Sequence, residues 1–178
     1  MLPEFLDVYC RESHPNTRLV NIAMECVGLP VAKFDNKSDL FKDGAFNGCC
    51  SFIRFCLFSS GVPVPDYTNV VGEHKPLLYV NEFFDHFGVL VDIKRIKSGD
   101  LVFFSRRGER PQHIGMYLGD NKYIHAPSRE GVVKVDELHV WEIPNLSEKA
   151  IYFNNPIGVK RAVVPTSHPR WTQALLCF

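Results

Sequence analysis

The stretch that decides the fold is HIGMYLGDNKYIHA, which runs from His113 to Ala126. Two runs rich in apolar and aromatic residues flank the turn residues Gly119, Asp120 and Asn121. Runs of this kind, separated by a short connection with Gly and Asn, are typical of a β-hairpin. We therefore expect two antiparallel strands joined by a three-residue loop, in which Asn121 takes the left-handed conformation that it tolerates better than most residues.

The length of this loop fixes which side chains share a face of the hairpin. With three loop residues, Leu118 pairs with Lys122 and Gly115 lies opposite His125. His113 then becomes the diagonal neighbour of His125 on the same face, with β-carbons about 7 Å apart or less. A two-residue loop would turn the two histidines to opposite faces. Gly115 has no side chain and leaves space for the two rings.

Further strand and helix patterns surround the hairpin. Apolar strand-like runs occur at LVFF (Leu101–Phe104), VVKV (Val132–Val135) and IGVKRAV (Ile157–Val163). Helical spacing of apolar residues occurs earlier, at Asn16–Val27, Cys49–Ser60 and Pro76–Phe87, with an irregular loop expected over 32–46. Helices come first and an antiparallel sheet second, so the sequence predicts an α+β domain. The whole chain, 1–178, is expected to form a single domain.

The second of these helices lies in NGCCSFIRFCLFSSG, from Asn47 to Gly61. Its residues are apolar on nearly every face, which is typical of a helix in the centre of a domain. Gly61 is expected to end it, and Pro63 and Pro65 prevent its continuation.

Cys49 stands at the expected start of this helix, where the helix dipole lowers the pKa of a thiol and favours the thiolate. Cys50 points about 100° further round the helix and is expected in the core. A nucleophilic cysteine needs a base, and the base needs an orienting group. We therefore propose that His113 takes the thiol proton of Cys49 and that His125 holds the ring of His113 in the correct tautomer.

Other roles for these residues are open. Cys49 is alternatively a small core residue, which free cysteines usually are. A zinc site from the two adjacent cysteines and the two histidines has the right ligand types. Adjacent cysteines are not the spacing that structural zinc favours, however, so no metal is expected. Arg107 and Arg110 belong either to a solvated loop or to a substrate-binding edge that attracts a carboxylate.

Composition excludes several other functions. Lys plus Arg equals Asp plus Glu, at 20 each, among 178 residues. This balance argues against a nucleic-acid surface and against polybasic attachment to a membrane. The first residues lack the features of a secretory signal, and no run is long enough to span a bilayer. We therefore expect a cytoplasmic protein, or one exported by a route that needs no such signal.

Two segments resemble the NlpC-type cell-wall cysteine peptidases. GCCSFIRF resembles the family's nucleophile motif DCSGFV, and aligning the Phe-Ile pair with Phe-Val puts Cys49 on the nucleophile. KSGDLVFF and QHIGMYLGDNKYIHAPS resemble the family's GDLVFF, HVGIYLG and FIHA segments, which puts the base on His113 and the third polar residue on His125. KRAV resembles the closing strand, so the likeness covers about Asn16 to Val164.

This resemblance implies a papain-like fold, with N-terminal helices packed on a C-terminal antiparallel sheet and a Cys-His-His triad. The catalytic core would occupy about 16–164, followed by a tail at 165–178. The implied substrate is the peptidoglycan stem peptide, cleaved between a D-γ-glutamyl residue and a diamino acid. The implied mechanism uses no metal and no organic cofactor.

The chain departs from the family pattern around the nucleophile. Gly48 stands where the family usually has Asp, and Cys50 and Ser51 stand where it has Ser and Gly. Val31 stands where the family has a Tyr associated with the substrate site. These departures leave two alternatives open. One is another papain-like chemistry on an amide substrate, namely deamidation, transglutamination or acyl transfer. The other is an inactive binding module that retains the fold.

Overall fold

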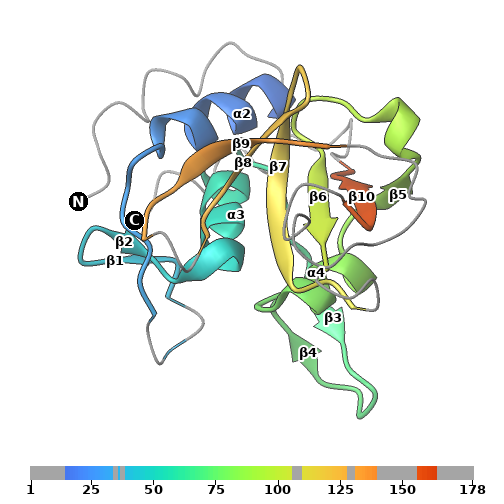
Figure 1. Ribbon diagram of the computed structural model, residues 1–178. Coiled ribbons are helices and arrows are strands. Elements are labelled where there is room, and N and C mark those ends of the chain that lie inside the picture. The colour runs from blue at the N-terminus through green and yellow to red at the C-terminus, as the bar shows by residue number, and fades with distance from the viewer. Residues whose placement is uncertain are drawn as a thin grey trace.

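The computed structural model describes residues 15–33, 36, 39–105, 110–127, 131–139 and 156–163. A six-stranded antiparallel sheet dominates this part of the chain, with the strand order β5-β10-β6-β7-β8-β9 (Figure 1). Its strands are β5 (Val89–Val91), β6 (Leu101–Phe104), β7 (His113–Gly119), β8 (Lys122–His125), β9 (Lys134–Glu137) and β10 (Gly158–Arg161). The α+β prediction is confirmed. None of the helices within the described residues combines the length and apolar character needed to cross a bilayer.

Among the described residues, three α-helices precede or interrupt the strands. They are α2 (Pro15–Glu25), α3 (Gly48–Ser59) and α4 (Val80–His86), and a short 3-10 helix, η1 (Ile93–Arg95), follows β5. The prediction that the third helix begins at Pro76 was wrong. The Glu82 carboxylate accepts the backbone N–H groups of Leu78 and Tyr79, at 2.7 and 2.9 Å, and so fixes the start of α4 at Val80.

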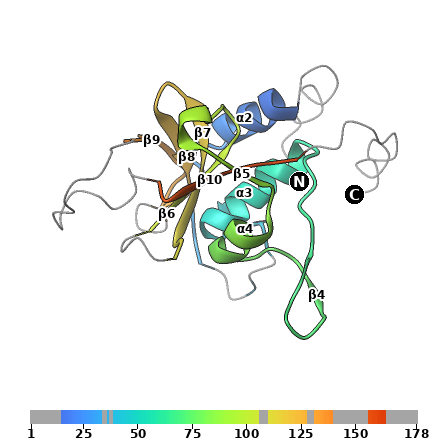
Figure 2. The same ribbon diagram turned by 90° about the vertical axis from the view of Figure 1, so that its right-hand side faces the viewer.

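Two small hairpins were missed in the sequence. The segment expected to be irregular contains β1 (Phe41–Lys42) and β2 (Ala45–Phe46), which pair across a tight turn. A second hairpin, β3 (Tyr67–Thr68) with β4 (His74–Lys75), projects away from the sheet in both views (Figures 1 and 2). Strands of two residues are too short to produce a recognisable alternation of apolar and polar residues.

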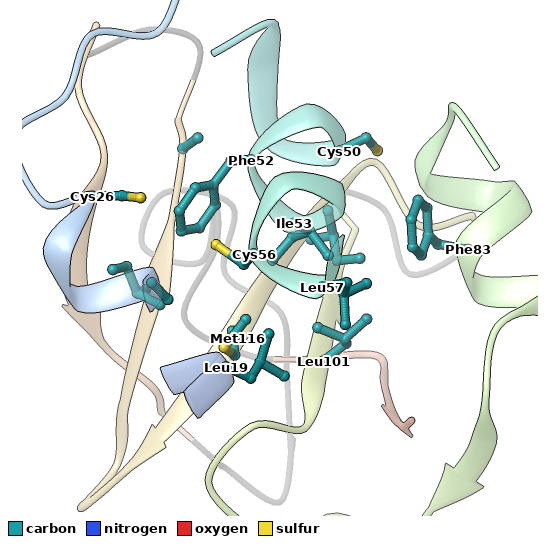
Figure 3. Close-up of a cluster of buried hydrophobic side chains, with 14 of the residues drawn as sticks. Leu19, Cys26, Cys50, Phe52, Ile53, Cys56, Leu57, Phe83, Leu101 and Met116 are labelled. Carbon is teal, nitrogen blue, oxygen red and sulfur yellow. The ribbon is translucent and has the colours of Figure 1, made fainter. Parts of the chain in front are cut away.

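The helices cover one face of the sheet and form the main core. Ile53, Cys56 and Leu57 of α3 are fully buried, and Figure 3 shows them between side chains of α2 and of the sheet. The sheet contributes alternate residues to this core, namely Leu101, Phe103, Ile114, Met116 and Ile124. The other face carries a second, smaller cluster that includes Val102, Phe104, Tyr117, Tyr123 and Val159.

Helix α3 ends as the sequence predicts. Gly61 takes a φ of +74°, its N–H donates to the carbonyl of Phe58, and the N–H of Val62 donates to the carbonyl of Leu57. These two bonds form a Schellman motif, in which a left-handed glycine satisfies the last carbonyls of a helix. The motif therefore sets the C-terminal end of α3.

The turn between β7 and β8 differs from the prediction. Asp120 and Asn121 both have positive φ, at 48° and 53°, and Gly119 pairs with Lys122, so the loop has two residues. The expected three-residue loop was therefore wrong. A register shift between Tyr117 and Gly119 inserts one extra residue into β7. This bulge compensates for the shorter loop, so Gly115 still lies opposite His125.

Candidate active site

Cys49 is the second residue of α3, which begins at Gly48. The first N–H groups of a helix have no partner within the helix, and the dipole is positive there. The Cys49 side chain is half-buried, and the His113 imidazole and the backbone N–H of Ile114 are close enough to its sulfur to lower the pKa of the thiol. The N-terminus of α3 and the first residues of β7 therefore meet at this sulfur.

These contacts favour the thiolate form of Cys49. The Cys50 thiol, then the His113 ring and the Ile114 N–H, hold the pKa of Cys49 well below its ordinary value, against the opposing effect of burial. The thiolate is the nucleophilic form of cysteine, so the arrangement suits nucleophilic chemistry near neutral pH.

The other two cysteines of α3, Cys50 and Cys56, have the opposite character. Contact with the Cys49 sulfur, and then burial, raise the pKa of Cys50 well above its ordinary value. Burial, followed by contact with Cys26, does the same for Cys56. Figure 3 shows Cys50 and Cys56 on different sides of α3, with Cys50 facing Phe83. Both thiols therefore keep their protons, and Cys50 is the one that donates toward Cys49.

His113 and His125 lie side by side on neighbouring strands. The Nε2 atom of His113 is 2.7 Å from the Nδ1 atom of His125, and the two rings meet edge to face. Both side chains are buried, at 5% and 1% exposure. The structure thus brings Cys49, His113 and His125 together, in the order in which the sequence analysis assigned their roles.

A carboxylate lies beyond the second histidine. The Nε2 atom of His125 is 3.0 Å from the Oδ2 atom of Asp136, and the same oxygen is 3.0 Å from the Nζ atom of Lys134. Burial, and then the charge of His113, lower the pKa of His125 to about 4, although Asp136 acts in the opposite direction. His125 is therefore neutral at physiological pH.

Asp136 was not among the residues predicted from the sequence. The strand predicted at Val132–Val135 begins and ends two residues too early, since β9 runs from Lys134 to Glu137. Alternation along the true strand places Lys134 and Asp136 on one face, and Lys134 lies opposite His125. The signal was present in the run VKVDEL, but the register of β9 against β8 cannot be counted from the sequence without the length of the intervening loop.

Of the two arginines predicted to bind substrate, only Arg110 is among the described residues. Arg107 lies outside the described residues, and Arg110 is exposed in the connection between β6 and β7. Their role remains a prediction. Within the residues that the structure describes, no group of three or more His, Cys, Asp or Glu side chains is arranged to hold a metal ion.

This combination of helices on an antiparallel sheet, with a cysteine at the tip of the buried helix, places the molecule among the papain-like α+β proteins. The chain belongs to the NlpC/P60 family, whose family model matches residues 42–149. This is a family of cysteine peptidases that act on peptidoglycan peptides. The family resemblance seen in the sequence is confirmed.

Two characterised relatives match shorter stretches. The murein DD-endopeptidase MepS/murein LD-carboxypeptidase of Escherichia coli K12 is 39% identical over 46 residues, which are 26% of this chain and 24% of that protein. A γ-D-glutamyl-L-lysine dipeptidyl-peptidase of Bacillus cereus is 37% identical over 54 residues, which are 29% of this chain and 16% of that protein. The matched stretches thus span no more than about a quarter of the length of these relatives.

Solved structures extend the likeness to most of the fold. An NlpC/P60 family protein of Bacillus cereus has a TM-score of 0.61 at 23% identity, and covers 85% of this chain and 41% of that one. The Mycobacterium tuberculosis protein RipD has a TM-score of 0.57 at 14% identity, and covers 85% of this chain and all of that one. RipD is described as a non-catalytic domain adapted to peptidoglycan binding, so the fold alone does not decide activity.

Proposed function

We propose that this protein is a cysteine peptidase that cleaves amide bonds in peptidoglycan stem peptides, with Cys49 as nucleophile, His113 as base and His125 as the residue that orients it. The observation that carries the proposal is the juxtaposition of three side chains: His113 acts on Cys49 and helps to lower its pKa, and the Nε2 atom of His113 is 2.7 Å from the Nδ1 atom of His125. Family membership supports the substrate class. A single domain over the full chain is part of the same proposal.

In this mechanism the Cys49 thiol gives its proton to the ring of His113, and the thiolate attacks the carbonyl carbon of the scissile amide. The backbone N–H of Cys49, at the positive end of α3, helps to hold the negative oxygen of the tetrahedral intermediate. Protonated His113 then donates its proton to the departing amine, and the C–N bond breaks to leave a thioester. Water, deprotonated by His113, hydrolyses the thioester and restores the thiol.

The bond next to a D-γ-glutamyl residue is our first candidate for cleavage. The sequence resemblance motivates it, and one relative is named as a γ-D-glutamyl-L-lysine dipeptidyl-peptidase. Val31, at the position of the family's substrate-site Tyr, packs at the edge of the main core and pairs with Phe46. The segment around Val31 therefore differs from the family pattern in this chain.

Mass spectrometry of digested muropeptides tests this function. We expect cleavage between D-γ-glutamate and the diamino acid, and no turnover after Cys49→Ala. The matched control is Cys50→Ala, which removes a neighbouring thiol of the same helix. This variant should retain turnover, but the acidic side of its pH profile should move to higher pH, because the Cys50 thiol helps to lower the pKa of Cys49.

Two results contradict the proposal. If Cys50→Ala abolishes turnover and Cys49→Ala does not, the nucleophile is misassigned. If the unmodified protein binds muropeptides without cleaving them, and iodoacetamide labels Cys49 no faster than the other thiols near neutral pH, the protein is a binding module.

A further inference from the structure

Asp136 reaches from the surface of the sheet to a buried ring. Its side chain is 31% exposed, whereas that of His125 is 1% exposed. The contact joins the Oδ2 atom of Asp136 to the Nε2 atom of His125 at 3.0 Å. The carboxylate is therefore the outer end of a line of groups that runs inward through His125 and His113 to the sulfur of Cys49.

The pairing of β8 with β9 places Asp136 next to His125. Lys134 lies directly opposite His125, and Asp136 lies opposite Tyr123. Because side chains alternate along a strand, all four share one face, and Asp136 is the diagonal neighbour of His125. Figure 1 shows β8 and β9 side by side at this end of the sheet.

Proton positions follow from the chemistry of the partners. Asp136 is ionised at neutral pH because Lys134 and then His125 keep its pKa below the ordinary value, despite the opposing effect of burial. A carboxylate only accepts hydrogen bonds, and a neutral imidazole carries one N–H donor and one acceptor nitrogen. The proton of His125 must therefore lie on Nε2, which leaves its Nδ1 as an acceptor.

The position of the proton on His125 also determines the position of the proton on His113. The acceptor Nδ1 of His125 lies 2.7 Å from the Nε2 atom of His113, so that Nε2 carries a proton and donates. This leaves Nδ1 as the nitrogen of His113 that is available to exchange a proton with Cys49. The hydrogen bond to Asp136 thus determines, through the rings of His125 and His113, which nitrogen of His113 can accept the proton of Cys49.

We propose that Asp136 is a positioning residue of this site, whose carboxylate fixes the tautomer of His125 and thereby presents Nδ1 of His113 to Cys49. The inference rests on the proposed roles of Cys49, His113 and His125 and extends the three-residue site by a fourth group. Asp136 does not touch the reacting atoms, so its effect passes entirely through the histidines.

The competing interpretation is a simple ion pair between Asp136 and Lys134 on the surface of a strand. Both side chains are partly exposed, at 31% and 27%. Exposed ion pairs contribute little to stability and have no influence on a distant thiol. The two interpretations therefore differ in what happens at His125 and Cys49 when the carboxylate is removed.

The test compares four variants of the whole chain without any substrate. Asp136→Leu removes the acceptor, and Asp136→Asn removes the charge but keeps an accepting oxygen. The double change Lys134→Met with Asp136→Leu also removes the cation that would otherwise lose its partner, and it supplies the same test if the single variant does not fold. Glu137→Leu is the matched control, because it removes the same charge from the next residue of β9, which is exposed.

Two measurements are made on each variant at pH 7: the ring ¹⁵N chemical shifts of His113 and His125, and the rate of Cys49 alkylation by iodoacetamide. Without the acceptor we expect His125 to lose its Nε2–H form as the single tautomer, and Cys49 alkylation to slow by about tenfold or more, as is common when a group that orients a catalytic residue is lost. Asp136→Asn should retain most of both properties, and Glu137→Leu should match the unmodified protein.

An unchanged tautomer and an unchanged alkylation rate in both acceptor-free variants would overturn the assignment, as would an equal loss in Glu137→Leu. Neither measurement uses a peptide. Failure of muropeptide cleavage therefore counts against the proposed function alone, and failure of these measurements counts against the role of Asp136 alone.

Discussion

Gly115 shows how one residue controls the space for two rings. It lies opposite His125, between the strand positions of the two histidines. A β-carbon added there would stand 2.8 Å from the Cδ2 atom of Tyr123 and 3.3 Å from the β-carbon of His125. The residue is required for its small size, since any side chain would move His125 or the aromatic ring beside it.

We expect Gly115→Ala to reduce kcat/KM on muropeptides by about tenfold or more, because a displacement of about 1 Å in a site of this kind has effects of that order. Overpacking should also lower the free energy of unfolding by about 1–3 kcal/mol. Enzyme kinetics and urea unfolding measure the two effects. Gly158→Ala is the control, because its β-carbon would meet the Phe84 ring at 2.6 Å, away from the site. Equal activity losses in both variants would contradict a specific role for Gly115.

At the scale of elements, α3 has two functions at once. Its middle is the centre of the core, and its second residue is Cys49, the proposed nucleophile. The β7–β8 hairpin has a similar double role, because the bulge near Leu118 keeps both histidines on one face. In each element, a feature of backbone packing positions a side chain of the site.

Leu57→Ala should therefore lower the free energy of unfolding by about 2–5 kcal/mol, because it leaves a cavity in place of a fully buried side chain. Phe58→Ala, the next residue along α3, is the comparison. Its side chain is 48% exposed, so a cost well below that of Leu57→Ala is expected. Urea denaturation gives both values, and a larger loss in Phe58→Ala would mean that the helix is rotated relative to the structure described here.

At the scale of the whole molecule, an ion pair links β10, the last described strand, to the residue before β6. Arg161 of β10 donates two hydrogen bonds of 2.7 Å to the buried carboxylate of Asp100, which directly precedes β6. This pair joins residues far apart in the sequence.

Titration of His125 makes the free energy of unfolding fall as the pH falls. Its pKa is about 4 in the folded protein and about 6.5 in an unfolded chain. The folded state keeps His125 neutral. The neutral ring therefore contributes fully to the free energy of unfolding above pH 6.5, and this contribution is lost as the pH falls from about 6.5 to about 4. The groups that face it are His113 on β7 and Asp136 and Lys134 on β9.

We expect the unmodified protein to lose about 2 kcal/mol of unfolding free energy through this group between pH 7.5 and pH 5. Urea denaturation at a series of pH values measures the loss. His125→Gln lacks the titrating ring while other groups are unchanged, so the difference between the two curves isolates it. Parallel curves over this range would contradict the burial of a neutral His125.

Much of the molecule was predictable because it depends on local sequence. The span of α3 follows from a continuous apolar run that ends at Gly61, and β6 and β7 follow from their apolar patterns. The start of α4 was misplaced because Glu82 accepts two backbone N–H groups, which selects one helix start among several that the sequence permits. The turn of the hairpin was misjudged because an extra residue in a strand has no local signature.

The sequence by itself determined the order of helices and strands and the position of Cys49 at the positive end of a buried helix. Each of these depends on spacing along the chain, which periodicity fixes. Only the tertiary structure decided that the Cys49 sulfur meets His113, that a bulge restores the hairpin register, and that Asp136 stands behind His125. Those contacts join segments whose relative placement is set by packing across the core and by strand pairing, and neither is encoded in any single stretch of residues.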